Sequence, residues 1–106
     1  MVTPNITVVT LDSDPNLIHE LQDILGKSLQ GWCDIVLSFS SVPFIGNDHL
    51  SALLRTRKAQ KDHCRKMILC DVKPEVKKII IDHGLEKLFR IVDNKDTARA
   101  VLTAVA

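Results

Sequence analysis

Short runs of β-branched and aliphatic residues alternate with longer amphipathic stretches four times, and this alternation constrains the fold most. The runs at residues 6–11, 34–39, 67–70 and 88–92 are typical of strands. Each is followed by a stretch whose apolar residues recur at helical spacing. Such alternation predicts βαβ units with right-handed crossovers. We therefore expect an α/β fold with a four- or five-stranded, mostly parallel sheet and about four helices.

Residues that begin or end helices stand where this pattern requires them. Asp14 suits an N-cap, and Pro15 suits the first position of the first helix. Gly26 or Gly31 can end that helix, and the apolar stripe favours Gly31 because Leu29 extends it. The later boundaries follow the same chemistry: Pro74 opens the third helix, Gly84 closes it, and Asp93 or Asn94 caps the last.

Length and charge exclude several classes of protein. A chain of 106 residues predicts a single domain spanning residues 1–106. A net charge of +1 gives no general attraction to nucleic acid or to a membrane surface. No apolar run approaches the roughly 20 residues of a membrane span, and the N-terminus lacks the features of a signal peptide. Three cysteines without framework spacing predict reduced thiols and a cytoplasmic protein.

Candidate catalytic and metal-ligating residues form no recognisable constellation. His63-Cys64 and Cys70-Asp71 do not fit the spacing of a compact tetrahedral site. His49 follows Asp48, but no nucleophile is paired with it, so we interpret His49 as an exposed polar residue in a first helical turn. We therefore expect no enzyme activity, no catalytic residue, no metal and no cofactor.

Three segments in the expected order resemble the STAS domain family, the anti-sigma-factor antagonists. Residues 34–45 resemble the family's central strand and its exit, residues 72–80 its Pro-Glu-Val helix, and residues 84–93 its closing Gly-Leu-x-x-Leu-Phe strand. The stretch from Phe44 to Leu54 is similar to the family's signature loop, which typically runs Phe-Ile-Asp-Ser-Ser-Gly-Leu-Gly-Ala-Leu-Leu. The family's second strand, with its Gly-x-Leu-Asp stretch, has no counterpart, so we expect a shortened opening hairpin.

The resemblance implies that the family's phosphorylation switch is missing here. Asn47 stands at the position of the phosphorylated Ser or Thr, and an amide cannot accept a phosphoryl group. Gly46 and Asp48 replace the flanking Asp and Ser. We expect Phe44, Ile45 and Leu50 to seat the loop. Two readings of the helix start stay open: Asn47 caps the helix and Asp48 favours its positive end, or Asp48 acts as a fixed negative charge.

The same resemblance implies a non-catalytic regulatory module that docks onto a protein. The expected partner is an anti-sigma-factor kinase or another STAS protein, including a second copy, with no nucleic acid and no membrane insertion. An alternative is a STAS subunit of a membrane lipid or anion transport complex. The expected partner-binding residues surround the loop and follow the next helix: Ile45, Gly46, Asn47, Asp48, His49, Leu50, Leu54 and Arg57. Ser40, Ser41 and Ser51 are alternative phosphate acceptors.

A second resemblance, to response-regulator receiver domains, offers another fold alternative. Residues 8–15 resemble the receiver's first strand and the acidic residues that follow it. The receiver chemistry fails, because Ser38 and Phe39 stand where an Asp nucleophile is needed. An antiparallel N-terminal strand would favour STAS. A fully parallel sheet with Asp12 and Asp14 converging on Ser38 would favour a degenerate receiver-like domain.

Overall fold

The computed structural model describes residues 6–13 and 15–103, and it confirms the alternation of strands and helices. In chain order the elements are β1 (Ile6–Thr10), α1 (Asn16–Leu29), β2 (Asp34–Ser38), α2 (Asn47–Asp62), β3 (Met67–Cys70), α3 (Pro74–Asp82), β4 (Arg90–Val92) and α4 (Lys95–Thr103). Cys70 ends a buried strand and Cys64 lies between α2 and β3, as the sequence indicates. All three thiols are free.

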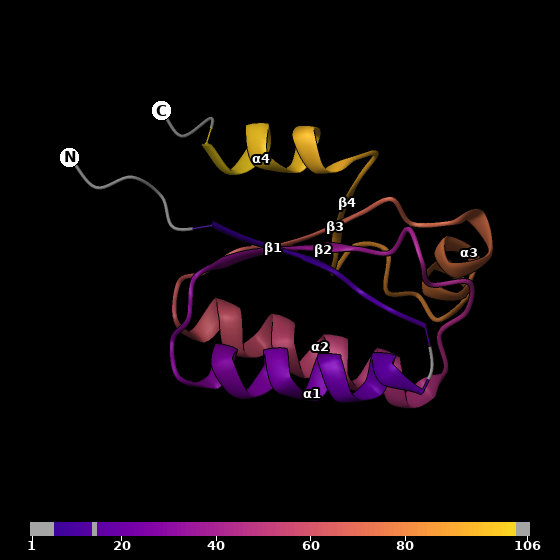
Figure 1. Cartoon of the computed structure of the whole chain (residues 1–106), viewed down its shortest axis with the longest axis horizontal. Coiled ribbons are helices and arrows are strands. Elements are labelled where there is room, and N and C mark those ends of the chain that lie inside the picture. Colours follow the sequence, from indigo (N-terminus) through magenta and orange to yellow (C-terminus); the bar gives the residue numbers. More distant parts are fainter. Residues whose placement is uncertain (1–5, 14, 104–106) are drawn as a thin grey trace.

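The four described strands form one parallel sheet in the order β1-β2-β3-β4. Val36 of β2 pairs with Val8 of β1 on one side and with Ile68 of β3 on the other. Figure 1 shows α1 and α2 together on one side of the sheet and α4 on the other. Because each strand is followed by a helix and the strands are parallel, the β2–α2 loop lies at the carboxyl edge of the sheet.

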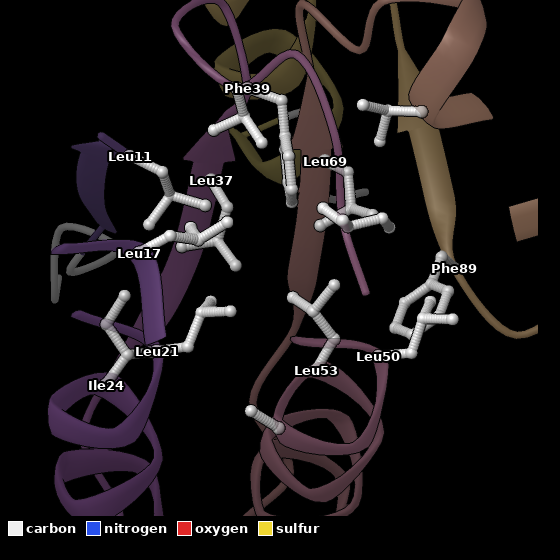
Figure 2. Packing of buried hydrophobic residues seen from close by; sticks show 14 of the residues in the cluster. Leu11, Leu17, Leu21, Ile24, Leu37, Phe39, Leu50, Leu53, Leu69 and Phe89 are labelled. Carbon is white, nitrogen blue, oxygen red and sulfur yellow. The ribbon is translucent and has the colours of Figure 1, made fainter. Parts of the chain in front are cut away.

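The larger part of the core lies between the sheet and the α1–α2 pair. Leu17 and Leu21 of α1 and Leu53 of α2 are fully buried, and Figure 2 shows them pointing toward the strands. A smaller cluster fills the other face, where Val36 and Ile68 pack with Leu102 of α4. Burial on both faces explains why β2 and β3 read as continuous apolar runs instead of alternating ones.

The chain ends its helices largely where the sequence indicates. Gly31 and Gly84 follow the last turns of α1 and α3 in the left-handed conformation, with φ of 78° and 69°, which favours glycine. The side-chain oxygen of Asn94 accepts the Thr97 backbone N–H at 2.8 Å, so Asn94 caps α4. Pro15 is the residue just before α1 and not its first helical residue. Asp14 lies outside the described residues, and so does the segment before Ile6, so the antiparallel N-terminal strand that would favour STAS is not tested.

Candidate functional site

The loop between β2 and α2, the expected functional segment, is anchored by two of its apolar side chains. Val42 and Ile45 are buried, with exposures of 0% and 1%, so Ile45 seats the loop as expected. Phe44 is 62% exposed, and the prediction that it also seats the loop is wrong. Pro43 and Phe44, which lie between these two buried residues, are both exposed. The loop therefore presents an aromatic ring to solvent.

The start of α2 differs from the expectation at two residues. Gly46, not Asn47, is the N-cap, and Asn47 is the first helical residue. His49 is 2% exposed instead of solvated. Its ring nitrogen Nδ1 accepts the Gly46 backbone N–H at 2.8 Å. Because glycine has no side chain with which to cap, the N3 residue His49 reaches back to the N-cap and supplies half of a capping box.

Asp48 is exposed in the first turn of α2. Its Oδ1 accepts the backbone N–H of His49 at 2.9 Å. A carboxylate here lies at the positive end of the helix and satisfies one of the N–H groups that the helix leaves without a partner. The placement agrees with the expectation that Asp48 favours the helix start, and it leaves the carboxylate open to solvent.

The remaining residues expected to bind a partner divide by exposure. Leu50 is 4% exposed and belongs to the main core with Ile45, so both support the loop from inside. Leu54 packs against that core and is only partly exposed. The Arg57 Nε donates to the backbone oxygen of Leu88, which directs the side chain toward the β4 side of the molecule. Fewer of the expected partner-binding residues are thus exposed at the loop than the sequence indicates.

We define the docking surface by five residues around the loop that are exposed together: Phe44, Asn47, Asp48, Ser51 and Arg55. A groove of about 380 Å³ runs beside them between α1 and α2. Asp48, Ser51 and Arg55 form its α2 side. Phe44, Ser51 and Arg55 are absent from the partner-binding residues expected from the sequence, although Ser51 was expected there as an alternative phosphate acceptor. The spacing of Asp48, Ser51 and Arg55, three and four apart and opposite the buried leucines, was the signal for that exposed stripe.

A second hollow, of about 500 Å³, lies between the end of β1 and the start of α1, with Ser41 of the loop at its rim. Asp12 lines it, and its carboxylate accepts the Asn16 Nδ2 at 3.0 Å and the Ser13 backbone N–H at 2.9 Å. These hydrogen bonds, that from Asn16 most of all, lower the pKa of Asp12. The carboxylate is thus engaged by the beginning of α1.

Ser38 is fully buried at the end of β2, and its hydroxyl donates to Asp71 Oδ2 at 2.8 Å. The Cys70 thiol donates to the same carboxylate oxygen at 3.6 Å. Burial, with the nearby charge of Asp71, raises the pKa of Cys70 to about 11. Asp71 therefore connects the ends of β2 and β3 by accepting hydrogen bonds from the buried Ser38 hydroxyl and the protonated Cys70 thiol.

Among residues 6–13 and 15–103, no group of three or more His, Cys, Asp or Glu side chains gathers as metal ligands would.

A family model for the STAS domain matches residues 2–98, which is nearly the whole chain. The chain belongs to the STAS domain family. The resemblance noted in its three segments is thereby confirmed, and the expected α/β fold agrees with STAS structures.

Solved structures share the fold of this STAS domain. The anti-sigma-factor antagonist SpoIIAA in its unphosphorylated form matches with a TM-score of 0.78 and 18% identity, over 100% of this chain and 95% of that one. A STAS domain protein from Planctomyces limnophilus matches at 0.79 and 16%, over 98% and 97%. A sulfate transporter family protein from Wolinella succinogenes matches at 0.77 and 19%, over 97% and 91%. Among proteins of curated function, none matches this sequence significantly.

Membership of the STAS family decides against the receiver-like alternative. The described sheet is fully parallel, which we expected of a receiver, but its order β1-β2-β3-β4 differs from the 2-1-3-4-5 order of receiver folds. Ser38 forms a hydrogen bond with Asp71, while Asp12 forms hydrogen bonds with Asn16 and Ser13, so these hydrogen bonds do not join Asp12 to Ser38.

Within the described ranges, no helix of this STAS domain combines the length and apolar character that a membrane span requires.

Proposed function

We propose that this STAS domain is a non-catalytic regulatory module that binds a protein partner through the docking surface. One observation carries the proposal: Phe44 is 62% exposed in a loop whose neighbouring apolar residues Val42 and Ile45 are buried. Exposed aromatic residues are enriched at the centres of protein interfaces, where they contribute much of the binding energy. Asn47, Asp48 and Ser51, the exposed polar residues that follow Phe44 at the start of α2, suit an interface rim.

The partner we propose is an anti-sigma-factor kinase or another STAS-containing protein. This rests on the fold shared with anti-sigma-factor antagonists. Asn47 is exposed at the first position of α2, where the family carries its phosphorylated hydroxyl. We infer that docking at this surface is not switched by phosphate on residue 47. Three free thiols support a location in the cytoplasm.

A second candidate is a regulatory subunit of a membrane transport complex. The observation that favours it is the match to the sulfate transporter family protein from Wolinella succinogenes, which is as similar in fold as the antagonists are. In that case the same docking surface would contact a transporter component. The two candidates share the surface and differ in the partner that it recognises.

The proposal is tested by capturing protein partners with the wild-type protein and with two variants, one of which changes a residue as exposed as Phe44 but distant from the loop. The wild-type protein, Phe44→Asp and Leu29→Asp are each immobilised, and cross-linked partners are identified by mass spectrometry. Leu29 is 61% exposed at the far end of α1, so the same substitution there adds the same charge and also removes an exposed apolar side chain, away from the loop. We expect a kinase or STAS partner with wild type and with Leu29→Asp, and its loss with Phe44→Asp.

A transport component captured in the same Phe44-dependent way would establish the second candidate. Equal capture by wild type and Phe44→Asp would show that the docking surface is wrongly placed. Recovery of neither partner class by the wild-type protein would contradict the proposed function itself. Circular dichroism of all three proteins confirms that each is folded.

A further inference from the structure

A basic cavity of about 510 Å³ opens at the end of the sheet opposite the docking surface. Its walls are the carboxyl-terminal half of α2, the amino ends of β3 and β4, and Val101 of α4. Because the strands are parallel, this amino end and the carboxyl-edge loop lie at opposite ends of the sheet. The cavity is within the size range of sites that hold small molecules.

Five basic side chains line this cavity, and its lining contains no Asp or Glu: Arg57, Lys61, Arg65, Lys66 and Arg90. None of the five forms an ion pair with an acidic residue of the described chain. The chain has 14 basic and 13 acidic residues, so only nine basic residues remain to balance 13 acids elsewhere. The positive charge is thus gathered at one place in a chain that is close to neutral.

The cavity also has an apolar part, formed by Met67, Ile68, Leu88 and Val101. Leu88 is 39% exposed, and its backbone oxygen accepts Arg57 Nε, which fixes one wall to the next. A simple counterion needs no apolar surface, whereas an organic anion uses both the charge and the apolar wall. The combination therefore favours an amphiphilic ligand over an inorganic ion.

Gln60 joins the α2 wall of the cavity to the segments that lead into β2 and β3. It lines the cavity at 1% exposure, and its Nε2 donates to the backbone oxygens of Cys33 and Lys66 at 2.7 and 3.0 Å. Its Oε1 is buried and has no hydrogen-bond partner in the described part of the chain. The two donated hydrogen bonds hold this part of the cavity wall in place.

We propose that the basic cavity binds a small organic phosphate, with the phosphate among the five cations and its apolar portion on the Met67–Leu88 side. Arg guanidinium groups match phosphate oxygens in geometry and charge, which favours phosphate within the class of organic anions. This site is separate from the docking surface, and neither proposal depends on the other.

The test is a titration followed by backbone amide NMR shifts, with 1-naphthyl phosphate as probe. We expect saturable shifts confined to residues around the cavity, with a Kd below about 1 mM. Arg65→Gln/Arg90→Gln, which changes two exposed side chains of the cavity lining, should weaken binding about tenfold. Lys77→Gln/Lys78→Gln removes the same charge from exposed positions on α3 and should leave Kd within about twofold. Phe44→Asp should bind as wild type does.

Three results would overturn the proposal. Inorganic phosphate binding as tightly as the naphthyl ester would show that the apolar wall contributes nothing. Equal loss in the two double variants would show general charge attraction instead of a site. Tighter binding of hexaglutamate than of the ester, with shifts at the same residues, would assign the cavity to an acidic protein segment.

Discussion

His49 Nδ1 accepts the backbone N–H of Gly46 at 2.8 Å, and this bond fixes the geometry of the docking surface. The imidazole is buried at 2% exposure beneath the loop that presents Phe44 and Asn47. A residue that looked like a solvated polar group therefore joins the loop to α2. Its contribution is structural, and it bears on the proposed docking only through the residues that it positions.

His49→Ala should lower the free energy of unfolding by about 1 to 2 kcal/mol, because it removes a cap and leaves the Gly46 N–H without that acceptor. His49→Gln should be less damaging, since Gln at N3 can reach back to the N-cap in the same way. His19→Ala, an exposed position on α1, is the control and should cost little. Chemical denaturation measures all three. A His49→Ala protein as stable as His19→Ala would contradict this role of the bond.

The burial of His49 shows where sequence reasoning reached its limit. Periodicity located the strands and helices, and left-handed glycines at Gly31 and Gly84 marked helix ends, because these signals are local in the chain. The side to which a loop residue points depends on what packs beneath it. Residue type therefore misassigned both Phe44 and His49, an apolar residue that faces solvent and a polar residue that is buried.

Contacts between residues far apart in the chain could not be predicted from local sequence patterns. Ser38 and Asp71 are 33 residues apart, and only the pairing of β2 with β3 brings them together. The basic residues at the end of α2 and just after it share a cavity with Arg90, because β4 lies next to β3 in the sheet. The order of the strands in the sheet brings together both Ser38 with Asp71 and the end of α2 with Arg90. No single segment of the sequence encodes that order.

Asp48→Asn tests the two readings of that carboxylate. If Asp48 chiefly stabilises the helix start, the variant should lose about 0.3 to 1 kcal/mol of unfolding free energy and keep its affinity for the captured partner. Asp62→Asn, an exposed acid at the other end of α2, is the matched control. A clear gain of partner affinity in Asp48→Asn alone would instead identify Asp48 as a fixed charge that weakens docking.

Asn47→Ser should restore a phosphate acceptor at the position that matches the family phosphosite. Incubated with ATP and a panel of anti-sigma-factor kinases, the variant should gain the mass of one phosphoryl group at residue 47, where wild type gains none. Asn16→Ser is the control, because Asn16 is the first residue of α1 as Asn47 is of α2. Stoichiometric phosphorylation of the wild-type protein at Ser40, Ser41 or Ser51 would contradict the inferred loss of the switch.

The raised pKa of Cys70 predicts a loss of stability in alkali. The folded protein holds the thiol proton to about pH 11, while an exposed thiol releases it near 9.0. Between these values the unfolded chain binds fewer protons than the folded one, so the free energy of unfolding falls as pH rises. Below pH 9 the contribution is fully present. The difference between a thiol pKa of 9.0 and one of about 11 corresponds to at most about 2 to 3 kcal/mol of unfolding free energy.

Cys70→Ala should remove this dependence, whereas Cys64→Ala, which changes an exposed thiol, should keep it. The measurement is the unfolding free energy of each protein at about pH 8 and about pH 10.5, chosen to bracket the interval between the two pKa values. Other groups that titrate there, chiefly lysines, are common to all three proteins and cancel in the comparison. If wild type and Cys70→Ala lose the same stability over this interval, the Cys70 proton is not held by burial beside Asp71.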